Sequence, residues 1–367
     1  MTDQRIGVAV IGVGGVSLGN HLPGLALIPG VEIVALCDRS EEALAKAGAL
    51  FKVQTLHRDP QAVIDDDRVQ AVVIATPNRV HRELALAAVR RGRHVLCEKP
   101  LSLSTLEALE MLEAAEKAGV RHMTAFTYRF VPAMRYMKHL VDRGYVGRPL
   151  HFRAQRFQDW GRRHLGWRQL AAEAGTGELG DMLSHRLDFG HLLLGPIVRV
   201  SARLKQLVDT RIAADGSAHP ADVDDWAACL ADFANGATGV LESTKLATAR
   251  GDGSTGHDWC EVNGSEGTLA YRLGDPHRLQ MGRPGALLEP ADIPAEFLKV
   301  PGSPRDATAG DPLQSFRYDQ AFEFISAIRE GRPCRPSFRD GVRVQAVMDA
   351  IVESARTDRG VAVRADL

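Results

Sequence analysis

The chain has 367 residues, 45% of them hydrophobic and 25% charged, and a formal net charge of −1. These values are those of an ordinary soluble globular protein, and the near-zero net charge gives no indication of a basic nucleic-acid-binding face. The length is sufficient for two domains with complete cores. No stretch approaches about 18 uninterrupted apolar residues, so no membrane span is expected.

The first residues of the sequence and its cysteines indicate a cellular compartment. The first residues run directly into an apolar strand pattern, with no apolar stretch of signal-peptide length. The five cysteines are scattered, odd in number and without a CxxC pair, which argues against a disulfide framework. The sequence therefore predicts a protein of the reducing cytoplasm.

Strand and helix patterns alternate through the first third of the chain. Short apolar runs predict strands at 6–11, 31–37, 71–75, 95–97 and 122–126. Helical spacing predicts helices at 41–51, 80–90 and 105–117. The last of these has Ser104 as its predicted N-cap, Glu107 completing a capping box, and Gly119 as its end. This alternation predicts βαβ units around a parallel sheet.

The pattern changes after residue 128. A further helix is predicted at 132–143, followed by alternating strands at 151–157, 198–207, 225–233, 238–245, 260–263 and 268–271. Such alternation predicts an antiparallel or mixed sheet with one exposed face. A long loop is predicted at 282–312, with helices at 316–330 and 340–357. We expect an α/β protein with one domain at 1–128 and a second at 129–367, with a C-terminal helix packing back on the first.

A glycine-rich string follows the first strand and opens a helix. It consists of Gly12, Val13, Gly14, Gly15, Val16 and Ser17. Glycines at this point permit a tight turn and close approach of a pyrophosphate to the backbone. Asp38 ends the next strand, near the ~20-residue spacing expected for the ribose-binding acid of dinucleotide folds. A glycine-rich turn without a nucleotide remains the alternative.

Asp38 and Arg39 bear on the identity of the cofactor. A carboxylate at this point accepts hydrogen bonds from the ribose hydroxyls of NAD and repels a 2′-phosphate. Arg39 is suited to pair with that phosphate. The sequence thus favours NAD and leaves NADP open.

Polar residues follow two more predicted strands. Thr76 and Asn78 follow the strand at 71–75, where Asn78 either bonds a cofactor or caps a helix. His81, one turn later, is either a cofactor contact or a structural histidine. Glu98, Lys99 and Pro100 follow the strand at 95–97. Because ligands bind at the carboxyl ends of parallel strands, Lys99 is placed to hold a substrate oxygen; the alternative is a surface lysine paired with Glu98.

A helix near the middle of the chain carries a second set of candidates. Asp181, His185 and Asp188 share one helical face by i+4 and i+3 spacing. A histidine between two carboxylates suits general acid–base catalysis. The alternatives are a buried, hydrogen-bonded histidine and a metal site, which no other Cys/His cluster in the sequence supports, so we expect no metal.

With these motifs in place, the chain resembles the glucose–fructose oxidoreductase/inositol dehydrogenase (Gfo/Idh/MocA) family over nearly its whole length. The most specific motifs are Glu98-Lys99-Pro100, the string from Gly177 to Asp188, and Tyr128-Arg129-Phe130. The resemblance implies a Rossmann domain followed by an α/β domain with a large open, mostly antiparallel sheet. It also implies dimers or tetramers formed through that sheet.

The resemblance further implies hydride transfer between NAD(P) and a hydroxyl carbon of a sugar, cyclitol or related polyol. By that similarity Lys99 and His185 form the catalytic pair, Asp181 contacts the substrate or His185, and Asp188 orients the histidine. The Lys99-Pro100 bond is often cis in the family. The implied partner is a small sugar or polyol, with no nucleic acid and no membrane.

An aromatic and basic loop precedes the helix of His185. Planar rings and guanidinium groups suit sugar faces and hydroxyls. With Tyr128 and Arg129, the predicted substrate-binding residues are Trp160, Arg163, His164, Trp167 and Arg168. Trp167 as a core residue is the alternative, and Asp224-Asp225-Trp226 is interpreted as structural.

Two rival functions remain open at this point. Some members of the family bind NAD tightly and use transient oxidation to permit elimination, as in certain glycosidases. Others are nucleotide-binding regulators that perform no chemistry. The combination of Lys99, Asp181 and His185 argues against the regulator, because a regulator needs no acid–base set.

Overall fold

The computed structural model describes residues 5–162, 164–251 and 257–364. The chain forms two compact units, one of Met1–Phe130 with Lys299–Val342 and the other of Val131–Leu298 with Arg343–Leu367. The predicted division into 1–128 and 129–367 therefore needs correction, because residues 299–342 return to the first unit. The physical reason is that apolar side chains of this returning segment complete the core of the first unit.

Six parallel strands form the sheet of the first unit, in the order β3-β2-β1-β4-β5-β6. Their bounds are β1 Ile6–Ile11, β2 Val31–Cys37, β3 Leu56–His57, β4 Ala71–Ile74, β5 His94–Cys97 and β6 His122–Thr124. The order reverses between the neighbours β1 and β4, and ligands of open parallel sheets bind beside the carboxyl ends at such a reversal. This arrangement confirms the predicted Rossmann-type domain.

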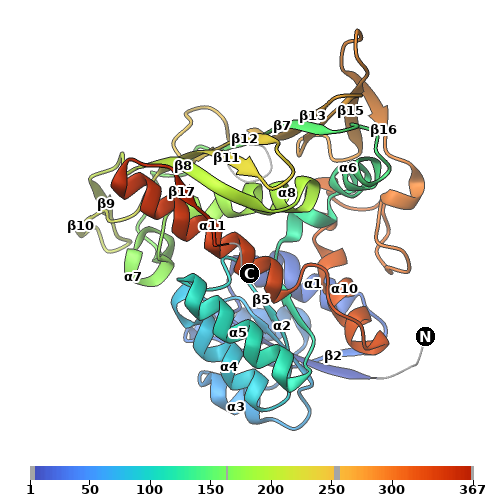
Figure 1. The fold of residues 1–367 in the computed structure, drawn as a ribbon. Helices are drawn as coiled ribbons and strands as arrows, with labels where there is room; N and C mark the ends of the chain where they lie inside the picture. The colour runs from blue at the N-terminus through green and yellow to red at the C-terminus, as the bar shows by residue number, and fades with distance from the viewer. Residues whose placement is uncertain (1–4, 163, 252–256, 365–367) are drawn as a thin grey trace. The chain divides into compact units, whose positions relative to one another are not determined.

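Helices flank this sheet, with α4 packed on α5 and α1 on α10 (Figure 1). Their bounds are α1 Leu22–Ala26, α2 Glu41–Phe51, α3 Pro60–Asp65, α4 His81–Arg90, α5 Thr105–Ala118, α9 Pro312–Ser315 and α10 Tyr318–Glu330. The unit also contains a π-helical turn, η1 (Ser17–His21), the 3₁₀ turns η2 (Asn78–Val80) and η3 (Thr127–Phe130), and the start of α11 (Phe338–Thr357).

The ends of α5 follow from its sequence. Ser104 Oγ accepts a hydrogen bond from the Glu107 amide at 3.3 Å, which confirms the predicted N-cap. The Glu107 carboxylate returns to the amide of Leu103 at 3.0 Å, one residue before the position that a capping box requires. Gly119 ends the helix with φ 67°, a left-handed conformation that glycine adopts without strain.

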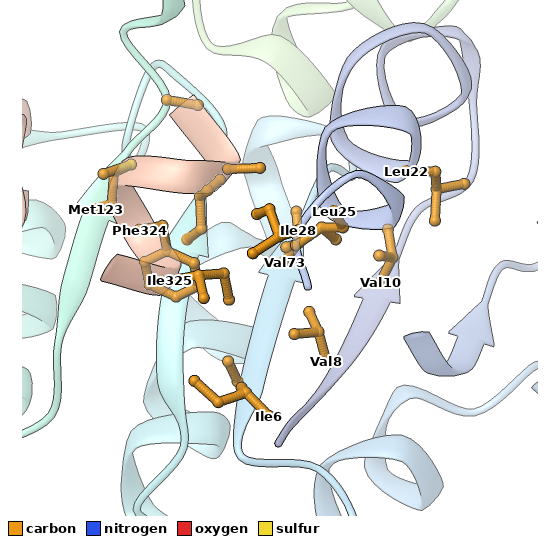
Figure 2. Packing of buried hydrophobic residues seen from close by; sticks show 14 of the residues in the cluster. Ile6, Val8, Val10, Leu22, Leu25, Ile28, Val73, Met123, Phe324 and Ile325 are labelled. Atoms are coloured by element: carbon orange, nitrogen blue, oxygen red, sulfur yellow. The ribbon is translucent and has the colours of Figure 1, made fainter. Parts of the chain in front are cut away.

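One apolar cluster joins the sheet to the returning segment. Figure 2 shows Val8 of β1, Leu25 of α1 and Met123 of β6 with Phe324 and Ile325 of α10. All five side chains are almost completely buried. Burying a side chain of this size stabilises the folded state by roughly 1.5–3 kcal/mol, so the first 130 residues alone lack part of their own core.

The second unit is built on a nine-stranded sheet in the order β16-β15-β14-β13-β7-β12-β11-β8-β17. Only the β7–β12 pair is parallel among the described ladders of this sheet. The bounds are β7 Pro149–Phe157, β8 Ile197–Lys205, β11 Trp226–Phe233, β12 Thr238–Thr244, β13 His257–Gly264, β14 Thr268–Arg272, β15 Arg278–Gly282, β16 Glu289–Asp292 and β17 Val361–Ala362. The predicted large, mostly antiparallel sheet is confirmed.

Smaller elements complete the second unit. A separate hairpin pairs β9 (Thr210–Ile212) with β10 (Ala218–Pro220). The helices are α6 Pro132–Asp142, α7 Ala171–Ala174, α8 Ser184–Leu194, the rest of α11, the π-helical turn η5 Leu179–Leu183, and the 3₁₀ turns η4 Trp167–Gln169 and η7 Ala295–Phe297. The predicted loop at 282–312 is wrong in part, because it contains β16 and η7.

The two faces of the large sheet differ in their side chains. Helix α8 packs on β7 and β12, and α6 packs on β14 (Figure 1). Alternate residues of β11 and β12 are buried, and the residues between them are half-buried or, like Leu230 and Val240, exposed. Among the described residues, no helix has the length and apolarity that a membrane crossing requires.

All five cysteines are free and buried, which predicts that their thiols react slowly in the native protein. Burial raises the pKa of Cys37, Cys229 and Cys334 to about 12, and it also raises the pKa of Cys97 and Cys260. The thiolate is the reactive form of cysteine. We therefore expect no thiol of the native protein to react with a chromogenic disulfide reagent, and all five thiols to react once the protein is unfolded. Rapid reaction of a thiol in the native protein would contradict this burial.

Candidate active site

The glycine loop begins at the carboxyl end of β1 with a residue that has to be glycine. The Gly12 amide donates to the Cys37 carbonyl at 2.8 Å, which joins the loop to the end of β2. Its φ is +90°, and a Cβ at this position would lie 2.4 Å from the Ala75 carbonyl oxygen. Both the conformation and the close approach to the residue after β4 exclude a side chain.

The rest of the loop fits a dinucleotide. A Cβ at Gly14 or Gly15 would meet no atom within 4 Å, so the backbone there is open to approach by a phosphate group. The Asp38 carboxylate accepts from the Val13 amide at 2.9 Å and from the Ser40 amide at 2.9 Å. Asp38 therefore holds the glycine loop in place, and it also lies at the end of β2, where the sequence predicts the residue that binds the ribose. Three more predicted cofactor contacts lie nearby: Val16, Ser17 and Arg39. Ser17 is buried and its hydroxyl donates to the Gly12 carbonyl, whereas Arg39 is exposed.

The segment after β4 is tied to the segment after β5. His81 is buried, with Nδ1 3.0 Å from the Pro100 carbonyl oxygen and Nε2 3.0 Å from that of Thr76. Both ring nitrogens thus face backbone carbonyl oxygens, so the prediction that His81 contacts the cofactor needs correction and the alternative of a structural histidine is favoured. The ring instead links the two strand ends. Pro77 is the N-cap of η2, so the alternative that Asn78 is a cap is also wrong.

Lys99 follows β5, as predicted, and the Lys99-Pro100 peptide bond is cis. Its neighbour Glu98 lies 2.8 Å from Nε2 of His21, a buried histidine of η1 that the sequence analysis did not identify. Burial raises the pKa of Glu98, but the hydrogen bond and charge of His21 and the charge of Lys99 outweigh burial, so this pKa lies below its usual value. Glu98 is therefore held as a carboxylate beside Lys99.

Tyr128 and Arg129 lie within the first unit. Tyr128 is buried against Phe316, with the Arg317 guanidinium 5.0 Å from its ring centre. Arg129 forms an ion pair with Asp340 at 2.9 Å. These internal partners favour a structural role for both residues over the predicted substrate contact.

A groove beside the glycine loop contains residues that the sequence analysis missed. It has a volume of about 580 Å³, and the returning segment contributes Gln314, Arg317 and Tyr318 to its lining. The Gln314 amide donates to the Gly19 carbonyl at 2.9 Å, which joins α9 to η1. Only the fold brings residues about 300 positions apart together, so no local signal identifies them.

In the second unit, Asp181, His185 and Asp188 lie on consecutive turns. Asp181 belongs to η5, and the other two belong to α8. The predicted helix is present, but its first turn is π-helical, a local widening that is frequent at functional sites. His185 and Asp188 are buried and Asp181 is partly exposed.

The start of this helix is fixed by Asp224. Its carboxylate accepts from the amide of Gly177 at 2.7 Å and from that of Leu179 at 2.8 Å. A Cβ at Gly177 would lie 1.9 Å from the Asp224 carbonyl oxygen, so only glycine fits. The structural role predicted for the segment at 224–226 is confirmed, because Asp224 anchors the helix that carries the candidate acid–base residues.

A buried ion cluster lies next to this anchor. The Asp225 carboxylate pairs with Arg211 of β9 and lies 3.7 Å from Lys245 Nζ. It also accepts from the amides of Leu207 and Val208, each at 2.9 Å. Breaking a buried pair by removing one partner typically costs about 3–5 kcal/mol, so this cluster fixes the loops around β9 and β11.

The aromatic and basic loop reaches the candidate helix through Arg168. Its Nε lies 3.5 Å from an Asp181 carboxylate oxygen, and its guanidinium lies 4.3 Å from the centre of the Trp167 ring. Trp167 is only half-buried, so the alternative that it is a core residue is wrong. Trp160 has Lys245 5.7 Å from its ring centre and His164 is exposed, whereas Arg163 lies outside the described residues.

Comparison with known proteins identifies the family. Residues 6–126 match the model of an oxidoreductase family with an NAD-binding Rossmann fold, and residues 134–270 match the GFO/IDH/MocA C-terminal domain. The chain belongs to the Gfo/Idh/MocA family. The predicted family, its Rossmann fold and the prediction of NAD as cofactor are thereby confirmed.

Two relatives in the Gfo/Idh/MocA family match nearly the full length. Levoglucosan dehydrogenase of Pseudarthrobacter phenanthrenivorans is 31% identical, with 98% of both chains covered. D-Apiose dehydrogenase of Paraburkholderia graminis is 30% identical, with 99% of this chain and 91% of the relative covered. A solved complex of levoglucosan dehydrogenase with NADH and levoglucosan has a TM-score of 0.89 at 30% identity, covering 98% of this chain and 100% of that one.

Across the described ranges of the chain, no group of three or more histidine, cysteine, aspartate or glutamate side chains has an arrangement that could hold a metal ion.

Proposed function

We propose that this chain is an NAD-dependent dehydrogenase that oxidises a hydroxyl carbon of a sugar, cyclitol or related polyol, with Lys99 and His185 as its catalytic pair. The observation that carries this proposal is the family membership, combined with a lysine at the carboxyl end of β5 and a buried histidine in α8. The named relatives act on levoglucosan and D-apiose, both carbohydrates, which supports this class of substrate.

Each residue has a defined role in the proposed reaction. NAD, when bound, supplies the hydride acceptor. His185 takes the proton from the substrate hydroxyl, a role suited to an imidazole whose ordinary pKa is near neutrality. Lys99 donates a hydrogen bond to the same oxygen and stabilises its developing negative charge. Asp181 contacts the substrate hydroxyls or His185, and Asp188 orients the His185 ring.

The remaining predicted contacts divide between cofactor and substrate. We propose that Thr76, Asn78 and Glu98 border the cofactor, beside the glycine loop and Asp38. Trp160, His164, Trp167 and Arg168 are proposed to contact the sugar, and Arg168 also holds Asp181. The carboxylate of Asp38 favours NAD over NADP by repelling a 2′-phosphate.

The test is an absorbance assay for NADH with purified protein, NAD or NADP, and a panel of sugars, anhydrosugars, inositols and sugar acids. Sustained NADH formation with one compound class supports the dehydrogenase and narrows its substrate. Conversion of a glycoside without accumulation of NADH would instead support the redox-neutral rival. Cofactor binding with no turnover of any compound would support the regulator.

We also propose that the chain forms homodimers or homotetramers through the open face of its large sheet. Leu230 of β11 is 60% exposed, and it lies directly opposite Val240 of β12, which is 44% exposed. Trp226 and Trp259 contribute half-buried rings from the same face of the sheet. Exposed apolar side chains on an open sheet face that also carries polar ones, such as Leu230 and Val240 beside Arg153 and Glu242, are suited to a protein–protein interface of mixed character.

Replacing Leu230 by aspartate is expected to shift the protein to a smaller assembly, because a charge would have to be buried in the interface. Light scattering coupled to size-exclusion chromatography measures the mass. Leu50→Asp is the matched control, since Leu50 is 62% exposed on α2. An unchanged mass for Leu230→Asp would contradict the proposed interface.

Five free, buried cysteines also support the proposal of a cytoplasmic location. Reducing compartments keep thiols in this state. Fractionation of the source cells with an antibody against the chain would test this location.

A further inference from the structure

Glu178 is a buried carboxyl group at the start of the helix that carries Asp181 and His185. Its side chain has no exposed surface. Oε1 shares a hydrogen bond with the hydroxyl of Ser243 in β12. The same hydroxyl lies 3.0 Å from the Arg156 carbonyl oxygen in β7. Oε2 has no hydrogen-bond partner in the part of the chain that the structure describes.

The number of protons on Glu178 and Ser243 limits which of these hydrogen bonds can form at the same time. A serine hydroxyl has one proton, so Ser243 cannot donate both to the Arg156 carbonyl and to an ionised Glu178. If Glu178 is protonated, it donates to Ser243 Oγ, and Ser243 donates to the Arg156 carbonyl. All three groups then have partners, whereas an ionised Glu178 would take the Ser243 proton and leave the Arg156 carbonyl only with its bond in the β7–β12 ladder.

The second carboxyl oxygen of Glu178, Oε2, also favours the protonated form. An ionised carboxylate shares its charge between both oxygens, so a buried Oε2 without a donor would carry negative charge without compensation. Burying such a charge is far more costly than burying the carbonyl oxygen of a neutral acid. The geometry therefore favours the protonated form of Glu178 independently of its titration.

Burial and the charges packed around Glu178 together favour its protonated form. Burial raises the pKa of Glu178 most, the carboxylates of Asp181 and Asp224 also raise it, and the Ser243 hydrogen bond and the charge of Lys245 lower it, with a net pKa of about 8. The remaining charged groups of this region form ion pairs with one another. Asp225 pairs with Arg211 and Lys245, and Asp258 pairs with Arg156 of β7 and Arg186 of α8.

We propose that Glu178 is a positioning residue, a neutral carboxylic acid whose proton fastens the turn carrying Asp181 to strand β12. Asp181 lies three residues further along the same turn, and its amide donates to the Gly177 carbonyl at 2.9 Å. Glu178 thus fixes the turn through Ser243, while Asp224 fixes it through the amides of Gly177 and Leu179.

Ionisation of Glu178 would release this attachment. Above about pH 8 the carboxylate forms, Ser243 turns its proton toward it, and a second negative charge stands beside Asp181. Activity is then expected to fall on the alkaline side by about tenfold for each pH unit. Because the folded-state pKa is raised, the stability contribution of this group also falls as pH rises toward that value.

The first test measures the proton directly. Infrared difference spectra between the wild type and Glu178→Gln should show, at neutral pH, a carbonyl stretch of a protonated carboxylic acid that shifts in D₂O and disappears in strongly alkaline buffer. Glu353→Gln, at an exposed position of α11, is the matched control and should remove no such band. Absence of the band from the wild type at neutral pH would overturn the proposal.

The second test measures the consequence and rests on the proposed dehydrogenase activity. Glu178→Gln retains a donor for Ser243 and cannot ionise, so it should keep kcat near neutrality and lose the alkaline fall. Glu178→Ala should lower kcat at every pH without changing NADH affinity. An alkaline fall that is identical in wild type and Glu178→Gln would contradict the positioning role. If no sugar is turned over, the infrared result still decides the protonation state, so the two failures are distinguishable.

Discussion

Replacing Lys99 by methionine is expected to lower kcat by about 10²–10³-fold, the cost of removing a donor that stabilises a developing oxyanion. Replacing His185 by asparagine is expected to lower kcat by about 10²–10⁴-fold, because the proton acceptor is lost. Neither change removes a contact of the glycine loop with Asp38, so NADH affinity should change little. Steady-state kinetics on the best substrate, with NADH binding measured by fluorescence, checks both results.

Matched substitutions separate these effects from general damage. Lys117→Met and His219→Asn alter an exposed lysine and an exposed histidine, and both should leave kcat unchanged. If Lys99→Met or His185→Asn retains wild-type kcat, the assignment of the catalytic pair is wrong. The family membership would stand, because it rests on matches over residues 6–126 and 134–270.

Replacing Gly177 by alanine is expected to damage both stability and activity. The added Cβ would lie 1.9 Å from the Asp224 carbonyl oxygen, so the backbone has to move and the Asp224 carboxylate loses its two amide donors. We expect a loss of about 3 kcal/mol in the free energy of unfolding. Displacing the helix of His185 by about 1 Å would also lower kcat/KM by about 100-fold.

Urea unfolding followed by circular dichroism measures the first effect, and the NADH assay measures the second. Gly274→Ala is the control, because a Cβ there meets no atom within 4 Å. Wild-type stability and activity in Gly177→Ala would show that the start of this helix adapts, and that the close approach to Asp224 has no functional consequence.

The longer elements of the first unit could be predicted closely because nearby residues specify them, whereas the short elements β3, α3 and α9 were not predicted. Strand 6–11 and helix 41–51 have the predicted bounds, since a continuous apolar run and a polar N-cap mark them locally. The hairpin of β9 and β10 was missed, because β10 is only Ala218–Pro220 and all its residues are exposed. An exposed strand of three residues leaves no hydrophobic period to detect.

The candidate site was predictable only where a motif identifies it. Gly12, Asp38, Lys99 and His185 lie where their motifs placed them along strands and helices. Glu178 carried no signal, because whether a glutamate is buried depends on neighbours such as Ser243, 65 residues away. For the same reason the sequence left His81 open between a cofactor contact and a structural histidine, since its carbonyl partners belong to two different strand ends.

The returning segment has a consequence for synthesis of the chain on the ribosome. Phe324 and Ile325 of α10 fill the core beside β1 and β6, and they are made about 200 residues after Met123. Until they emerge, the nascent Rossmann sheet exposes an apolar surface that belongs inside the protein, a state prone to aggregation. The amino-terminal unit therefore cannot mature first, and its completion awaits translation through residue 342. A chain stalled before that point would remain a substrate for chaperones.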